Sequence, residues 1–150
     1  YVIGLRSSSA LAGFRGFYLN LLFPDVRVVN QSAASEIYEQ ILHISTGDVC
    51  IAISFPRYSK KTIMAMKFAK DKGATVVGIT DTASSLVAHS ADIKLYARSE
   101  MVSFLDSLVA PLSLINAIVV AAAESSGRDL ESNFENLEKI WAEYEVYEKY

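Results

Sequence analysis

The segment from residue 49 to residue 62 constrains the fold more than any other part of the chain. Residues 49–53 form an unbroken apolar run, which is typical of a strand that other elements cover on both faces. Pro56 cannot continue the hydrogen-bonded ladder, so the strand must end before it. Ser59 then stands at the N-cap position of a helical pattern, with Thr62 three residues later. The sequence therefore predicts a buried strand, a tight polar turn and the first turn of a helix.

The charges of this turn admit two interpretations. Lys60 and Lys61 fall in the first helical turn, where the helix dipole already carries partial positive charge, and both could simply point into water. Alternatively, an anion binds there, because free backbone N–H groups, two hydroxyls and the nearby Arg57 would all favour a phosphate. The turn alone does not decide between a solvated helix start and an anion site.

Length and composition bound the class of protein. The chain of 150 residues is long enough for one domain with a real core, and with 51% apolar and 21% charged residues it reads as globular. A net charge of −3 gives no general attraction for nucleic acid. The single cysteine, Cys50, has no disulfide partner and belongs to no metal-binding cluster, so we predict neither a metal nor a cofactor.

The sequence also gives expectations about the location of the protein in the cell and about the extent of the chain. The sequence shows no signal peptide and no uninterrupted membrane span, so we expect a cytoplasmic protein that does not enter a membrane. The chain starts directly on an apolar strand without a methionine. We therefore expect residues 1–150 to be a single domain cut out of a longer protein.

Apolar strand patterns alternate with helical patterns along the first two thirds of the chain. Strands are predicted at residues 1–5, 26–29, 49–53, 74–80 and 93–96, and helices at 10–23, 33–43 and 60–72. This alternation predicts an α/β fold of three layers, with a doubly wound, five-stranded parallel sheet and helices on both faces. Ligands of such sheets bind beyond the carboxyl ends of the strands, where the strand order reverses.

The last third of the chain is predicted to be helical. Residues 101–126 are apolar almost all round, which favours one long helix sandwiched between its own sheet and a second subunit, with Pro111 kinking or breaking it. A second helix over residues 130–147 carries a single apolar seam, which should pack on a core, its own or a partner's. The seam consists of Leu130, Phe134, Leu137, Trp141 and Tyr144.

Three motifs in this order resemble the sugar isomerase (SIS) domain. They are Gly4-Leu5-Arg6-Ser7-Ser8-Ser9 after the first strand, Ile53-Ser54 with Ser59-x-x-Thr62 after the third, and the strand Val76-Val77-Gly78-Ile79-Thr80-Asp81. The form of the second motif resembles the SIS domain at the C-terminal end of RpiR-type bacterial transcriptional regulators. The resemblance covers nearly the whole chain. It implies a flavodoxin-like five-stranded sheet that dimerises and holds a phosphosugar over the strand ends.

The resemblance also implies which residues bind the phosphate. Carried over position by position, the family's phosphate-binding hydroxyls fall on Ser7, Ser54, Ser59 and Thr62. The common family turn is Ser-x-Ser-Gly-x-Thr, whereas here a longer insert separates Ser54 from Ser59 and no glycine follows Ser59. Ser54 should therefore sit farther from the phosphate than the other hydroxyls. Three neighbours without a family counterpart complete the predicted site, namely Ser8, Arg6 and Arg57.

The site can belong to an enzyme or to a sensor. An aldose–ketose isomerase needs a general base near the sugar, and His43 and His89 both lie towards the amino ends of strands, away from the pocket. Glu100 near the pocket rim reads better as an acidic residue at a helix start, while Asp106 and Glu124 on the long predicted helix could still reach a dimer-shared site. The sequence thus offers no convincing base.

We therefore favour a phosphosugar-binding effector domain. It would be a homodimer or higher homo-oligomer, and it would reach DNA only through a helix-turn-helix domain upstream of residue 1. A phosphosugar isomerase is the alternative, and a bare dimerisation module without a ligand is a third possibility. The choice of sugar would come from loops such as residues 30–32 and 80–84.

Overall fold

A parallel sheet of five strands organises the domain. The computed structural model describes residues 1–29, 34–102, 105–127 and 130–148. The sheet has the order β2-β1-β3-β4-β5, and every neighbouring pair is parallel. Its strands are β1 (Val2–Gly4), β2 (Val28–Val29), β3 (Val49–Ile53), β4 (Thr75–Thr80) and β5 (Ile93–Tyr96). This is the flavodoxin-like order, so the predicted fold class is confirmed, and the order reverses between β1 and β3.

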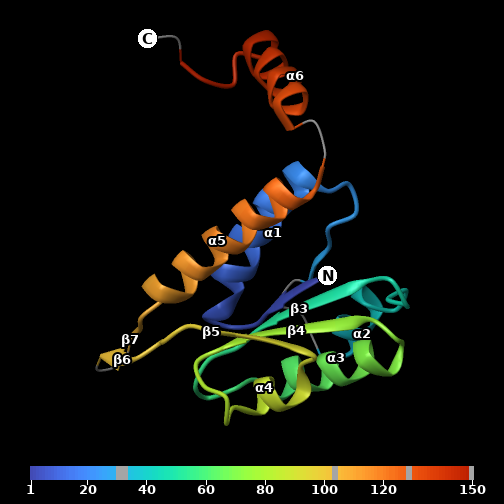
Figure 1. Cartoon of the computed structure of the whole chain (residues 1–150), viewed down its shortest axis with the longest axis vertical. Coiled ribbons are helices and arrows are strands. Elements are labelled where there is room, and N and C mark those ends of the chain that lie inside the picture. The colour runs from blue at the N-terminus through green and yellow to red at the C-terminus, as the bar shows by residue number, and fades with distance from the viewer. Residues whose placement is uncertain (30–33, 103–104, 128–129, 149–150) are drawn as a thin grey trace.

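Helices cover both faces of the sheet, as the alternation of elements predicted. Figure 1 shows α1 (Ser8–Leu22) and α5 (Val109–Ser125) on one face, and α2 (Ala34–Gln40), α3 (Lys60–Asp71) and α4 (Leu86–Ser90) on the other. Each face has its own apolar core. Ile41, Met66 and Val76 are buried in one core, and Leu11, Ile53 and Ile115 in the other.

The central strand and its helix form as the sequence predicted. In β3, Cys50, Ala52 and Ile53 have no exposed surface, because helices lie on both sides of the strand. Ser59 caps α3, since its Oγ accepts a hydrogen bond from the N–H of Thr62 at 3.3 Å. The helix ends at Asp71, and Gly73 follows with a φ of 85°, a left-handed conformation that suits glycine.

The prediction of one helix over residues 101–126 is wrong. Two short strands, β6 (Met101–Val102) and β7 (Leu105–Asp106), form an antiparallel pair, and α5 begins only at Val109. Pro111 lies in the first turn of α5. Backbone N–H groups there have no partner within the helix, so the N–H that proline lacks costs no helical hydrogen bond. The proline therefore marks the beginning of the helix and not a kink within it.

Within this single chain, α5 is only partly buried. Of its residues, only Pro111 and Ile115 are buried, while Val109 and Val120 are 78% and 56% exposed. One side of the helix packs on α1, and within the described chain no element covers its outer side. An apolar helix with an uncovered side is what the predicted second subunit would bury.

The last helix, α6 (Leu130–Glu143), stands apart from the sheet beyond the end of α5 (Figure 1). Its predicted seam is largely open, since Phe134 is 42% exposed and Tyr144 73% exposed. Phe134 and Leu137 face the end of α1 across a hollow of about 360 Å³. The side chain of Leu130 lies outside the described residues, as do residues 30–32 of the predicted specificity loops. None of the described helices is both long and apolar enough to cross a membrane.

Candidate functional site

Two turns at the carboxyl ends of neighbouring strands enclose a cavity, which we call the site cavity. Gly4 at the end of β1 pairs with Ile53 at the end of β3, so the turns that follow them lie side by side. The cavity between them has a volume of about 370 Å³. It is lined by Leu5, Arg6, Ser7, Ser8, Ser54, Phe55, Pro56, Arg57, Ser59, Asp106 and Leu108. Six of the seven predicted site residues are thus brought together at the point where the strand order reverses.

The first turn holds Ser7 at the beginning of α1. Arg6 has a φ of 56°, a left-handed conformation that is uncommon outside glycine, and this lets the chain reverse directly after β1. Ser7 precedes the helix, but its hydroxyl caps no backbone N–H group. That hydroxyl instead donates to the Oδ2 atom of Asp106 at 3.3 Å. The Ser7 hydroxyl therefore faces the cavity and not the helix.

The second turn is closed by two serines. The hydroxyl of Ser54 accepts a hydrogen bond from the N–H of Ser59 at 3.2 Å, and the backbone N–H of Ser54 donates to the carbonyl of Ile79. Arg57, between the two serines, has a φ of 67°. The longer insert thus folds back on itself, and Ser54, although 5% exposed, lies on the wall of the same cavity as Ser59.

Each of these two turns contains a strained backbone position; the third such residue of the described chain, Glu145, follows α6. Arg6 and Arg57 are non-glycine residues in the left-handed region, and each such residue costs on the order of 1–3 kcal/mol. Tyr58 helps to hold the second turn, because its hydroxyl donates to Asp81 Oδ1 at 2.7 Å at the end of β4. Burial and this hydrogen bond raise the pKa of Tyr58.

Thr62 is the one predicted site residue that does not line the cavity. Its side chain is fully buried in the first turn of α3, and its Oγ1 atom has no hydrogen-bond partner in the described chain. Its backbone N–H is already taken by the cap hydroxyl of Ser59. The position of Thr62 explains the capping pattern of the sequence, while a contact between Thr62 and a phosphate stays a prediction.

Positive charge surrounds the two turns. Arg6 and Arg57 line the site cavity, and both also line an adjoining hollow of about 420 Å³ together with Lys60 and Lys61. Neither α1 nor α3 has an acidic residue in its first turn. The N-termini of two helices and four basic side chains therefore face this region, and together they favour an anion.

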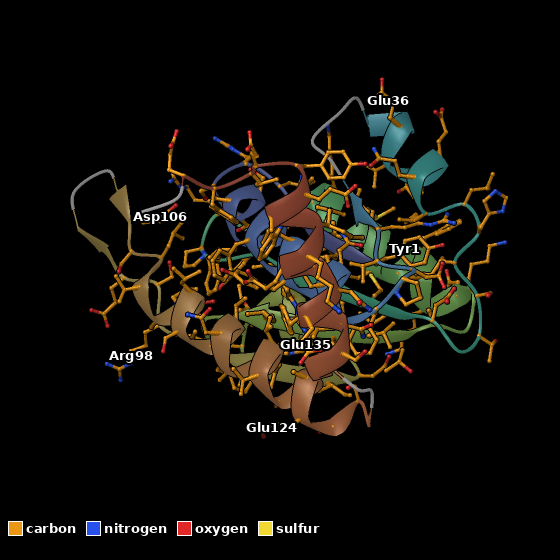
Figure 2. The ribbon with its side chains drawn as sticks, turned by 90° about the horizontal axis from the view of Figure 1, so that it is seen from above. Tyr1, Glu36, Arg98, Asp106, Glu124 and Glu135 are labelled. Carbon is orange, nitrogen blue, oxygen red and sulfur yellow. The ribbon has the colours of Figure 1, made fainter. Side chains whose placement is uncertain are left out.

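Asp106 is the functional candidate that the sequence analysis misplaced. It belongs to β7, and Figure 2 shows its side chain directed from the hairpin towards the body of the domain. Its Oδ2 atom lies 3.3 Å from Ser7 Oγ and 3.7 Å from Arg57 Nη2. Nothing in the sequence separates it from the apolar helix pattern that continues after it, because strands of two residues leave no periodicity.

The other acid–base candidates lie elsewhere. His43 and His89 are exposed near the amino ends of β3 and β5, as predicted. Glu124 is at the far end of α5 from Asp106 (Figure 2), and Glu100 is a highly exposed partner of Arg98. Among the described residues, Asp106 is the carboxylate that lines the site cavity. The described residues also contain no group of three or more histidines, cysteines or carboxylates that could hold a metal ion.

Comparisons with known proteins agree with this architecture. The family model described as "SIS domain" matches residues 1–121 of the chain. An uncharacterised HTH-type transcriptional regulator of Caldanaerobacter subterraneus is 29% identical over 103 residues, which are 66% of this chain and 36% of the regulator. A glutamine–fructose-6-phosphate aminotransferase (isomerizing) of Pyrococcus horikoshii is 35% identical over 98 residues, which are 65% of this chain and 16% of the enzyme. The chain therefore spans only a minor part of either relative.

Solved structures share the fold. The sugar isomerase domain of an RpiR transcription factor from Sphaerobacter thermophilus superposes with a TM-score of 0.75 at 24% identity, covering 88% of this chain and 73% of that one. The NanR protein of Vibrio vulnificus, solved in complex with ManNAc-6P, superposes with a TM-score of 0.73 at 17% identity and covers 94% of this chain and 54% of its own. With a family model that matches most of the chain and a sheet of the expected order, the chain belongs to the SIS domain family.

Proposed function

We propose that this chain is the phosphosugar-binding effector domain of a bacterial RpiR-type regulator of sugar metabolism. The observation that carries the proposal is the meeting of two serine-bearing turns, with two arginines, around one cavity at the strand-order reversal. A phosphate needs several convergent donors, and hydrogen bonds to a charged group contribute roughly 1.5–3 kcal/mol each. Hydroxyls of Ser7, Ser8 and Ser59 with the guanidinium groups of Arg6 and Arg57 would supply them.

The size and shape of the cavity suit a sugar phosphate. Its volume of about 370 Å³ falls at the lower end of the roughly 300–1,000 Å³ that small-molecule sites occupy. The polar turns form one part of the wall, while Leu5, Phe55 and Leu108 supply apolar surface. The phosphate would bridge the Ser7 turn and the Ser59 helix end, and the sugar would extend towards Leu108 at the start of α5.

The relatives support a regulator. One curated relative is an HTH-type transcriptional regulator, and this chain matches only 36% of it, which leaves room there for a separate DNA-binding domain. NanR, which has the same fold, is solved with ManNAc-6P. We infer that a helix-turn-helix domain lies upstream of residue 1 and that the protein acts in the cytoplasm. That upstream domain would make the DNA contacts, because the net charge of this chain is negative.

The uncovered side of α5 supports a homodimer. Val109 and Val120 are exposed there, and the seam of α6 presents further apolar surface to a second subunit. Because Leu108 joins the cavity to α5, an occupied site would change how the two subunits sit and so the spacing of attached DNA-binding domains. This route from pocket to subunit interface is part of the proposal.

A phosphosugar isomerase is the second candidate. Two observations favour it, namely the resemblance to an isomerising aminotransferase and the position of Asp106, a carboxylate inside the cavity that could act as a general base. Turnover of a sugar phosphate by the purified protein, lost in Asp106→Asn, would establish the enzyme. The absence of turnover, together with tight binding, favours the effector domain.

A thermal-shift experiment tests the proposal. Fructose 6-phosphate and ManNAc-6P are the phosphorylated probes, and their unphosphorylated sugars are the controls. A ligand at a hundred times its Kd stabilises by about 2.7 kcal/mol, which raises the Tm of a domain of this size by roughly 5–10 °C. Ser7→Ala should reduce the shift, and Ser90→Ala, whose hydroxyl bonds the carbonyl of Leu86 away from the cavity, should not. If neither phosphorylated sugar raises the Tm, the effector proposal fails.

A further inference from the structure

The carboxylate of Asp106 occupies a place that a bound anion would need. Its side chain is only 15% exposed, and its partners are the Ser7 hydroxyl at 3.3 Å and the Arg57 guanidinium at 3.7 Å. Arg57 is itself 66% exposed, and the bond to Ser7 is long. A largely buried carboxylate with two such distant partners is poorly compensated for its lost hydration.

The same two partners are donors of the proposed phosphate site. The Ser7 hydroxyl has one proton, so it can donate either to Asp106 or to a phosphate oxygen, but not to both. A phosphate held by Ser7 and Arg57 would also lie next to the carboxylate, and two like charges that close repel one another strongly. Binding of an anion and the present position of Asp106 are therefore mutually exclusive.

The segment that carries Asp106 is held weakly, so it can move away from the cavity. β7 pairs only with β6 in a separate sheet of two short strands, through Met101 with Asp106 and Val102 with Leu105. An isolated pair of strands is marginally stable, so its displacement costs far less than a shift of the main sheet. Leu108, two residues after Asp106, lines the cavity and precedes α5.

We propose that Asp106 is an internal competitor that occupies the anion site when it is empty and weakens the binding of every phosphate ligand. This inference rests on the proposed function. Inorganic phosphate offers only the anion and must displace the carboxylate from Ser7 and Arg57 without any further contact. A sugar phosphate must displace the carboxylate too, but it gains additional contacts with Leu5, Phe55 and Leu108 that offset this cost. Asp106 thus lowers the affinity for both ligands by repulsion, and only a ligand with the further contacts of a sugar binds tightly.

Titration calorimetry on the wild-type chain and on Asp106→Asn tests this inference. The probes are inorganic phosphate, fructose 6-phosphate and ManNAc-6P. Asn keeps the size of the side chain but removes its charge, so the affinities for inorganic phosphate and for the sugar phosphates should rise by a similar factor, at least about tenfold. Asp106→Ser should behave in the same way if Asn leaves a residual contact with Ser7.

Asp25 provides the matched control for Asp106. Asp25→Asn removes an exposed carboxylate that precedes β2, at the other edge of the sheet, and should leave both affinities unchanged. If Asp106→Asn leaves the affinity for inorganic phosphate unchanged, or if it weakens only the sugar phosphates, Asp106 is a sugar ligand or a base and the inference is overturned. If the wild-type chain binds no sugar phosphate either, the proposed function itself fails.

Discussion

Replacing Gly4 by alanine should disturb the fold and the site together. Gly4 is the last residue of β1, and the start of α1 crosses directly over it. A Cβ atom at this position would lie inside contact distance of the Ser8 carbonyl oxygen and 2.9 Å from the Cβ of Ala12. The Ser8 oxygen belongs to the backbone and cannot rotate away, so the first turn of α1 must move.

The size of the effect follows from the geometry. Forcing one extra methyl group into a packed core costs typically about 1–3 kcal/mol. In a domain of this length, 1 kcal/mol corresponds to roughly 2–4 °C in Tm, so Gly4→Ala should lower the Tm by about 2–12 °C. The moved turn carries Ser7 and Ser8, so the affinity for a sugar phosphate should fall as well.

Gly13 in the same helix is the matched control. An added Cβ there meets no atom within 4 Å, and alanine is more favourable than glycine in a helix by about 0.8–1 kcal/mol. Gly13→Ala should therefore stabilise the domain and leave binding unchanged. Urea unfolding followed by circular dichroism, at one protein concentration, measures the stability of both variants. A Gly4→Ala variant as stable as the wild-type chain would refute the packing argument.

Three further predictions concern single side chains. Ser59→Asp should keep the helix cap, and hence stability, but should abolish sugar-phosphate binding by like-charge repulsion; retained binding in calorimetry contradicts the site. Arg15 is 3% exposed, its Nε and Nη1 atoms have no partner in the described chain, and burial lowers its pKa to about 10. Arg15→Met should therefore raise the free energy of unfolding by about 1–3 kcal/mol, and a loss of stability in urea would be the opposite result. Burial raises the pKa of Cys50 to about 11, so the stability that its neutral thiol contributes is present below pH 9 and is lost as the pH rises through 11. At pH 8 its reaction with a thiol reagent should be roughly a hundredfold or more slower than that of a free thiol, and a fast reaction would mean that β3 opens readily.

Much of the sheet could be predicted from the sequence because its central strands are buried on both faces. Residues 49–53 and 74–80 are nearly continuous apolar runs, and a run of that length bounded by polar turns has few other interpretations. The meeting of the two serine turns followed from the topology, since the carboxyl ends of neighbouring parallel strands lie at one edge.

The hairpin and the conformations of the arginines could not be predicted. Residues 101–126 are apolar for two different reasons, a pair of short strands and a helix with an exposed apolar side, and periodicity cannot separate them. Only Pro111 offered a signal, because proline favours the first turn of a helix. The left-handed conformations of Arg6 and Arg57 could not be predicted from the sequence, because glycine is the residue that normally adopts them.

We propose that one phosphate binds between the turn after β1 and the turn after β3. Amide chemical shifts of the isotopically labelled domain, titrated with fructose 6-phosphate or ManNAc-6P, test this most directly. We expect the largest shift changes on residues 6–8 and 54–59, and none with the unphosphorylated sugars. Saturable changes centred on other residues, with these two turns unmoved, would contradict it.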